Sequence, residues 1–492
     1  MSSVRSSLAY ASTEQYLLLG LQLVGYFIVA RLLTPDDIGL FSVASAIVGV
    51  GLSLRDFGTA AYIVQEPELT DERVRTAFGV TLAVALTLGA AVFAAAPLIA
   101  AFYSDARMTT VLRVLAINFV VLPFGSTAMA LLRRNMNFRA VLCVNLSASV
   151  LSFALTIALA YQGFGAMSLV WATVANCVVT AGVAMLFEPR HARLLPGFSQ
   201  WRHVLAFGAR DAGVNMVTQA AMSVNDLVVG RVLGFAPVAL ISRAQGVMNL
   251  MHLQLLGAVR TVMFPALAKA QREGGDVAAA HRDAITIITV IAWPFYGFAA
   301  LFPMPLLRLM FGPQWDAAAA LVPLFCLAGA FAALWTLATS LLLATGRVDL
   351  YMRAELSVQS GRLLLLAACV MLVPTIEAFA VTFALCFIAF TPLYRHYCKR
   401  AIGAARLEDA SGLIRSAAVT LLSLAVPAAV AALARLDILP PVSPWAMLPL
   451  TLVWLAGWLV AVHAVAHPIR TDPTFGRLLN RFLPTRFVNA HR

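Results

Sequence analysis

Charged residues are scarce in this chain, which excludes an ordinary soluble protein. Only 12% of the 492 residues are Asp, Glu, Lys or Arg, whereas 61% are hydrophobic. A soluble domain carries roughly 25% charged residues. The usual estimate of domain number from chain length therefore does not apply. The first residues predict the lead-in to a retained membrane span rather than a removed signal peptide.

Enzyme and metal-site signatures are also missing. The sequence contains no G-x-x-x-x-G-K-[ST], no H-E-x-x-H and no G-x-S-x-G, which are the signatures of a P-loop, a zinc protease and a nucleophile elbow. Its six cysteines lie in or beside apolar runs and form no C-x-x-C pair, as small core residues do. We predict that the chain is not an enzyme and has no cofactor and no metal site.

Long apolar runs recur from end to end instead. Each run can cross a hydrocarbon core of about 30 Å as a helix, and none shows the short alternating pattern of a membrane β-barrel. We predict an all-α polytopic membrane protein of about 14 transmembrane helices. The expected spans are 10–31, 38–62, 77–102, 111–132, 141–161, 165–187, 204–228, 232–264, 284–307, 318–344, 354–373, 376–394, 413–434 and 445–467.

The net charge of +12 is unevenly distributed among the loops. Alternate loops carry most of the Lys and Arg, beginning with Arg5 and ending with the tail after His467. Cytoplasmic loops are the ones enriched in these residues, so both termini are predicted to be cytoplasmic. The basic balance thus reflects topology and contact with anionic lipids rather than nucleic-acid binding.

A repeat suggests that the chain was built twice. The segment 28–44 (IVARLLTPDDIGLFSVA) resembles 228–244 (VVGRVLGFAPVALISRA). Six spans separate the two copies, so both would enter the membrane in the same direction, as a parallel repeat. We therefore predict an N-lobe at 1–199 (spans 1–6), a C-lobe at 200–400 (spans 7–12) and two extra helices at 401–467. The tail at 468–492 is predicted to be a basic amphipathic cytoplasmic helix, with a disordered tail as the alternative.

Polar residues inside the expected spans are the candidates for a functional site. Each charge costs roughly 2.5–3.5 kcal/mol at the bilayer centre, so it needs a partner or a hydrated cavity. Several recur at helical spacing on single faces, which predicts a hydrated cleft between the lobes. The candidates are Arg55, Asp56, Arg210, Asp211, Asn215, Asp226, Arg243, Asn249, Arg260 and Glu355.

Some of these residues also have a plainer interpretation. Arg260 can be a lipid-headgroup anchor near the end of its span, as Arg31 and Arg231 can be at the other interface. Asp211 and Asp226 can be structural partners of Arg210 or Arg243 across neighbouring helices. The sequence leaves these alternatives open.

Several segments resemble the bacterial polysaccharide transporter family, the oligosaccharide flippases, and within it the branch associated with colanic acid and other exopolysaccharides. They are ARLLTPDDIGLFSVA (30–44), RDFGTAAYIVQ (55–65), LLRRNMNFRA (131–140), NDLVVGRVLG (225–234), ISRAQGVMNL (241–250) and MFPALAKAQ (263–271). The resemblance covers roughly residues 10–400. It places the chain in the multidrug/oligosaccharidyl-lipid/polysaccharide superfamily, whose members have two helical bundles and alternating access.

What the resemblance implies is flipping of polyprenyl-diphosphate-linked oligosaccharides across the bacterial inner membrane, for exopolysaccharide, capsule or lipopolysaccharide synthesis. It implies that Arg55 and Arg243 bind the diphosphate and acidic sugars. Asp226 is the acidic residue of the NDLVVGR motif. Arg210, Arg260, Asn215 and Asn249 are the further cavity candidates. Ile241 and Ala239 depart from the aromatic residue and glycine of many relatives, which weakens any claim about sugar contacts.

Three other functions compete with flipping. A cation-coupled drug antiporter of the same fold would use buried acids, for which Asp56, Asp211, Asp226 and Glu355 are the candidates. A glycan polymerase or ligase would need longer outer loops, and a scaffold would tolerate every cavity substitution. The partners expected for a flippase are the lipid-linked oligosaccharide, membrane lipids and glycan polymerase and export proteins, with the protein itself a monomer.

Overall fold

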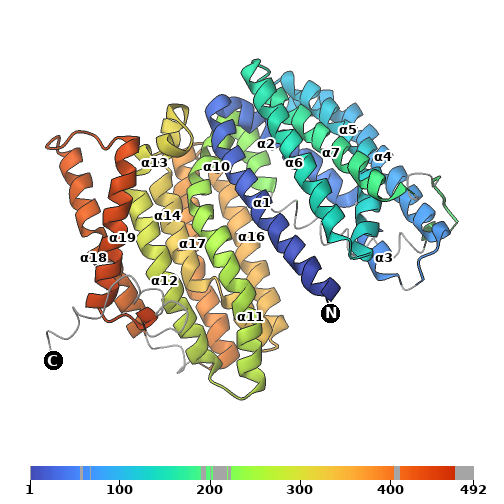
Figure 1. Ribbon diagram of the computed structural model, residues 1–492. Helices are drawn as coiled ribbons and strands as arrows, with labels where there is room; N and C mark the ends of the chain where they lie inside the picture. The colour runs from blue at the N-terminus through green and yellow to red at the C-terminus, as the bar shows by residue number, and fades with distance from the viewer. Residues whose placement is uncertain are drawn as a thin grey trace. The chain divides into compact units, whose positions relative to one another are not determined.

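The fold is built of helices. A computed structural model describes residues 2–55, 59–66, 68–189, 195–199, 201–202, 219, 223–403 and 410–470. Throughout this described part the regular structure is helical, without a strand, and the helices run beside one another within each part of the chain (Figure 1). The predicted all-α fold class is confirmed.

The helices are long enough to cross a membrane many times. The described residues contain 12 helices of suitable length and hydropathy, which match the predicted spans 1–6 and 9–14. Most of predicted span 7 lies outside the described residues. Predicted span 8 is helical, but a π-helical turn at Leu250–Leu255 interrupts it. The chain is therefore a multi-pass membrane protein, and the count of 14 spans stays a prediction.

The chain divides into two compact units, Met1–Ala239 and Leu240–Arg492. In unit 1, α5 packs on both α4 and α7, and α6 packs on both α1 and α7. The helices of this unit are α1 (Ser2–Leu32), α2 (Pro35–Arg55), α3 (Thr59–Gln65), α4 (Asp71–Tyr103), α5 (Arg107–Arg134), α6 (Phe138–Tyr161) and α7 (Ala166–Phe187), followed by helical residues 223–232.

Unit 2 is organised around α12, which packs on α14 and α18, while α17 packs on α14 and α16. Its main helices are α11 (Leu256–Arg272), α12 (Val277–Leu301), α13 (Pro303–Met310), α14 (Val322–Trp335), α15 (Ala338–Ala344), α16 (Val348–Leu372), α17 (Ile376–Ile402), α18 (Ser411–Arg435) and α19 (Met447–Ala464). Helix α10 (Phe235–Asn249) contains the boundary between the units. The predicted lobes and the parallel repeat stay predictions, and residues 471–492 of the predicted tail lie outside the described residues.

Short polar side chains set where several helices begin. Thr70, Asn137 and Thr375 each accept a hydrogen bond from the backbone N–H three residues later, and Asp276 accepts from those of Ala278 and Ala279. A side-chain oxygen at this position satisfies one of the N–H groups that the first helical turn leaves unpaired. The sequence thus ends one span and starts the next within loops of a few residues.

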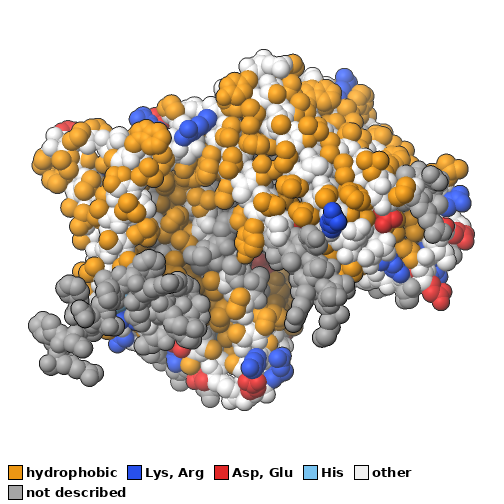
Figure 2. Space-filling model, in the orientation of Figure 1, with side chains coloured by type: hydrophobic (Ala, Val, Ile, Leu, Met, Phe, Trp, Pro, Cys, Tyr) orange, Lys and Arg blue, Asp and Glu red, His pale blue; other side chains and the backbone are white. Residues whose placement is uncertain are grey.

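The surface matches a lipid environment. Hydrophobic side chains cover most of the face in Figure 2, and charged ones lie mainly toward the ends of helices. On α18, for example, Leu421 is 73% exposed and Leu422 is 54% exposed. Exposed apolar area of this kind on so many helices marks a membrane-facing surface.

Candidate functional site

The structure describes only some of the predicted site residues. Asp56, Arg210, Asp211 and Asn215 lie outside the described residues. The backbones of Arg55 and Arg260 belong to α2 and α11, but their side chains are outside the described part as well. The roles predicted for these six residues stay predictions.

Arg243, on α10, lies in an aromatic enclosure. Its guanidinium carbon is 5.0 Å from the centroid of the Trp315 ring and 5.6 Å from that of Phe311. Both aromatic side chains are fully buried, and Arg243 itself is only 5% exposed. Cation–π contacts are strongest when they are desolvated. In this conformation Phe311 and Trp315 therefore lie against the guanidinium of Arg243 and help to shield it from solvent.

The enclosure is held in place from outside by an ion pair. Arg308 on α13 donates two hydrogen bonds to the carboxylate of Asp316, at 2.8 and 2.5 Å. The Arg308 guanidinium holds the pKa of Asp316 below its usual value. The pair spans the bend at Gly312, whose φ of +102° favours glycine. It therefore fixes the turn that carries both Phe311 and Trp315.

Asn249 is the last residue of α10, at the edge of the π-helical turn. Its side chain is half-buried. Just before it, the backbone carbonyl of Met248 accepts a hydrogen bond from the buried hydroxyl of Tyr296, at 3.3 Å. A π-helical turn shifts the backbone pairing and occurs often at functional sites. Since Arg243 and Asn249 share α10, the structure places these two predicted residues in one short segment.

Asp226 is half-buried in the helical residues 223–232 of unit 1. One turn earlier, the side-chain amide of Gln219 donates to the hydroxyl of Ser223, at 3.3 Å. Gln219, Ser223 and Asp226 all belong to predicted span 7. Their spacing of three and four residues places them along one face of a helix in unit 1.

Helical residues 223–232 and the start of α10 make a tight seam with α2 and α4 inside unit 1. The Tyr103 hydroxyl donates to the carbonyl of Leu227 at 3.2 Å, and its ring stacks on Phe235 with centroids 5.9 Å apart. A Cβ at Gly39 would lie 1.8 Å from the carbonyl oxygen of Phe235. Only glycine allows so close an approach of two backbones. The two segments of the sequence repeat therefore touch at this seam.

Glu355 anchors a polar network in unit 2. One carboxylate oxygen accepts from the Gln359 amide at 2.6 Å and the other from the Tyr394 hydroxyl at 3.1 Å. Arg362 in turn donates to the side-chain amide oxygen of Gln359. The network joins α16 to α17. Glu355 was a candidate from the sequence, but Tyr394 was not, because a tyrosine hydroxyl gives no signal before the helices are packed.

Glu14 is a second residue that the sequence analysis missed. It lies half-buried on α1 and accepts a hydrogen bond from the side chain of Asn145 on α6, at 2.5 Å. An acid inside a predicted span was the available signal. Glu14 therefore joins the candidate charged residues within the spans of unit 1.

Two solved transporter structures have a fold similar to that of this chain. The chain matches the lipid II flippase MurJ in an inward closed conformation, with a TM-score of 0.71 and 12% identity over 97% of this chain and 99% of that one. It also matches an inward-facing multidrug transporter of the MATE family in the MOP superfamily, with a TM-score of 0.61 and 15% identity over 79% of this chain and 95% of that one. At such identities the likeness shows the fold alone.

The sequence comparison names the family. Residues 28–320 match the family model described as polysaccharide biosynthesis protein. The chain belongs to this family, as the motif resemblance predicted.

Two curated relatives are named for the biosynthesis or transport of polysaccharides. The chain is 24% identical over 349 residues to the lipopolysaccharide biosynthesis protein WzxC of Escherichia coli (strain K12), covering 70% of each chain. It is 28% identical over 306 residues to the succinoglycan biosynthesis transport protein ExoT of Rhizobium meliloti (strain 1021), covering 60% of each.

Proposed function

We propose that this protein flips polyprenyl-diphosphate-linked oligosaccharide units across the bacterial inner membrane, for exopolysaccharide, capsule or lipopolysaccharide synthesis. The observation that carries the proposal is membership of the polysaccharide biosynthesis family over residues 28–320. The fold of a lipid-linked substrate flippase supports it. The protein acts as a transporter and not as an enzyme, with both termini in the cytoplasm.

The physical task is to carry an anion and a glycan past hydrocarbon. Neither group can cross unaided, because burying unpaired polar and charged groups costs several kcal/mol or more. A guanidinium replaces water well around a diphosphate, since its planar fork matches two phosphate oxygens. Arg55, Arg210, Arg243 and Arg260 supply such groups, with Asn215 and Asn249 as hydrogen-bonding partners for the sugars.

Alternating access by the N-lobe and the C-lobe exposes this site to one leaflet and then to the other. The polyprenyl chain stays in lipid while the headgroup passes. In the conformation described here, Arg243 is covered by Phe311 and Trp315, so movement of these rings belongs to the transport cycle. Glu355, with Asp56, Asp211 and Asp226, is the candidate for coupling the cycle to a cation gradient.

Reconstitution in vesicles tests the proposal. A defined polyprenyl-diphosphate oligosaccharide is placed in one leaflet, and its appearance in the other is scored with a lectin that cannot enter the vesicle. Arg243→Gln is expected to lower the flipping rate at least about tenfold, because charge-assisted hydrogen bonds to the diphosphate are lost. Arg231→Gln, which removes an exposed arginine that stacks on Phe102, is the matched control and should flip normally.

The same assay separates flipping from drug antiport. If Arg243→Gln flips normally while Asp226→Asn abolishes all transport, the drug-antiporter alternative gains. Because Arg243 is buried, Arg243→Lys is measured beside it, together with the melting temperature of each variant, so that a folding defect is recognised.

A further inference from the structure

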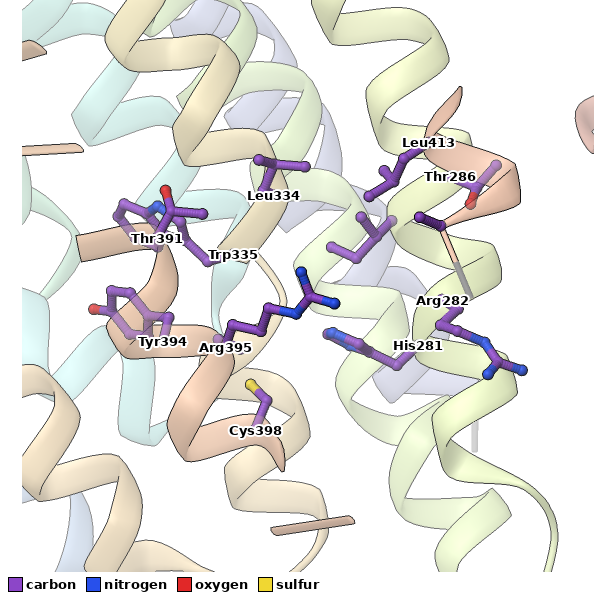
Figure 3. Close-up of a pocket in the computed structure, with 13 residues that line it drawn as sticks. His281, Arg282, Thr286, Leu334, Trp335, Thr391, Tyr394, Arg395, Cys398 and Leu413 are labelled. Atoms are coloured by element: carbon purple, nitrogen blue, oxygen red, sulfur yellow. The ribbon is translucent and has the colours of Figure 1, made fainter. Parts of the chain in front are cut away.

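A cavity of about 150 Å³ lies inside unit 2, away from Arg243. Its walls come from α12, α14, α15, α17 and the first residues of α18 (Figure 3). It lies toward the helix ends joined by residues 273–276 and 403–410, the side that the charge distribution predicts to be cytoplasmic. None of the candidate site residues lines it.

An arginine and a histidine enter the cavity from opposite walls. Figure 3 shows the guanidinium of Arg395, on α17, directed toward the imidazole of His281, on α12. The neighbouring Arg282 turns its guanidinium away from the cavity in the same view. Among the lining residues that the structure describes there is no aspartate or glutamate. The cavity is therefore electropositive.

His281, which lines the cavity, has a buried ring nitrogen. Its side chain is only 6% exposed, and within the described part of the chain its Nδ1 atom has no hydrogen-bond partner. The indole Nε1 of Trp335, which belongs to the same wall, also lacks a partner among the described residues. Buried polar groups in proteins are nearly always paired. Two residues that line one cavity and carry unpaired buried nitrogens therefore point to a further partner at this place.

Much of the remaining wall is apolar, although Thr286, Thr391 and Tyr394 also line it. Leu334, Trp335 and Leu413 lie on the side away from His281 (Figure 3). A site with an arginine and a histidine at one end and apolar side chains at the other fits a ligand that has an anionic headgroup and an apolar part. A phosphate is the anion that a guanidinium binds best, through paired N–H groups.

We propose that this cavity binds a phosphate group attached to an apolar moiety, with the phosphate between Arg395 and His281 and the apolar part against Trp335 and Leu413. This site is separate from the one proposed for the transported oligosaccharide. An anionic phospholipid headgroup from the adjoining leaflet and a soluble phosphate ester share this chemistry, and the experiment below distinguishes them.

The cavity adjoins the Glu355 network through Trp335 and Tyr394, which both line it. The Trp335 indole stacks on the Tyr394 ring with centroids 4.5 Å apart and planes 12° apart. The hydroxyl of the same tyrosine donates to Glu355. A ligand that fills the space against Trp335 therefore stabilises the stack that holds the Tyr394 hydroxyl on this carboxylate.

Native mass spectrometry of the full-length protein in detergent tests the proposal. The probes are phosphatidylglycerol, diacylglycerol as the matched lipid without phosphate, and glycerol 3-phosphate as the soluble phosphate ester. Arg395→Gln and His281→Phe are compared with Arg400→Gln, which removes an exposed arginine on the same helix that is not part of the cavity wall. Arg395 is exposed enough that its substitution should leave the melting temperature unchanged.

The proposal expects binding of one phosphate-bearing probe to weaken at least about tenfold in Arg395→Gln and in His281→Phe, and to be unchanged in Arg400→Gln. Arg395→Lys should recover part of it. Loss confined to phosphatidylglycerol identifies the lipid as the source, and loss confined to glycerol 3-phosphate identifies a soluble ligand. Equal binding of diacylglycerol and phosphatidylglycerol, or equal effects of the Arg395 and Arg400 substitutions, would overturn the proposal.

Discussion

Single glycines decide how closely segments of unit 1 approach at the seam. At Gly39 the space for a Cβ is taken by the backbone of Phe235, and at Gly230 by the side chain of Val43, 2.6 Å away. A neighbouring side chain can yield by changing rotamer, whereas a carbonyl cannot move without its helix. Gly39 is therefore the position at which a methyl group has the larger effect.

Gly39→Ala should separate α2 from the start of α10. We expect a destabilisation of about 1–3 kcal/mol from overpacking and a lower flipping rate. Pulsed electron paramagnetic resonance should show a longer distance between spin labels placed near Pro35 and Val238. The control is Gly20→Ala on α1, where a Cβ would meet nothing within 4 Å. An unchanged label distance in Gly39→Ala would show that the seam tolerates the methyl group.

Tyr394 contacts Trp335 through its ring and Glu355 through its hydroxyl. Tyr394→Phe keeps the ring stacked on Trp335 and removes only the hydrogen bond to Glu355. Hydrogen bonds to charged groups contribute about 1.5–3 kcal/mol, so the melting temperature in detergent should fall. Combining it with Glu355→Gln in a double-mutant cycle isolates this contact. Fully additive losses would mean that the two groups do not interact.

At the scale of elements, interruptions of the helices coincide with the predicted polar residues. The π-helical turn at Leu250–Leu255 follows Asn249 directly, and Pro265 lies within α11. Sequence periodicity predicts one span through this region, because hydropathy does not report a local change of hydrogen-bond pattern. Within the predicted span 232–264 the structure places α10, a π-helical turn and the first part of α11.

The end of α19 is fastened to α18 and α12 by a buried histidine. His467 Nδ1 accepts from the Ile469 N–H, and its Nε2 is 3.1 Å from the Ser416 hydroxyl oxygen. Ser416 in turn accepts a hydrogen bond from Thr289 on α12, at 3.0 Å. The imidazole is neutral in this arrangement, since one ring nitrogen acts as an acceptor.

This histidine predicts a pH dependence of stability. Burial lowers the pKa of His467 to about 4, and the positive charge of Arg415 acts in the same direction. An unfolded histidine has a pKa of about 6.5, so protons favour the unfolded chain below that value. Stability should be full above pH 6.5 and fall as the pH drops toward 4, by at most about 3 kcal/mol.

Melting temperatures measured in detergent from pH 7.5 to 4 test the dependence, with His467→Gln as the comparison. The variant should have a lower melting temperature at pH 7.5, and its melting temperature should fall less as the pH drops. Parallel curves for the two proteins would show that another group causes the acid sensitivity.

At the scale of the whole molecule, the distribution of Lys and Arg predicts that both termini are cytoplasmic. A fluorescent protein fused after Arg492 should fold and fluoresce in cells, because it matures in the cytoplasm, whereas alkaline phosphatase at the same place should be inactive. As a control, alkaline phosphatase inserted between Gly163 and Phe164, in a loop predicted to face outward, should be active. Active alkaline phosphatase at the C-terminus would contradict the predicted orientation.

Much of the fold could be predicted from sequence because hydropathy acts locally. Twelve of the predicted spans match helices such as α6 and α18, since a run of apolar residues must form a complete helix in lipid whatever surrounds it. The site could be predicted less well. Arg243 and Glu355 stood out as charges in apolar runs, but the partners Phe311, Trp315 and Tyr394 look like ordinary core residues until packing brings them together.

The sequence by itself determined that this protein is an all-helical membrane protein of the polysaccharide biosynthesis family, because hydrophobic runs and motifs are properties of the chain. Only the tertiary structure decided that Arg243 lies behind two aromatic rings, that Gly39 touches the backbone at Phe235, and that Arg395 and His281 share a cavity. These pairs are dozens of residues or more apart in sequence. Their meeting depends on which helix faces pack together, which side-chain shape decides and hydropathy does not.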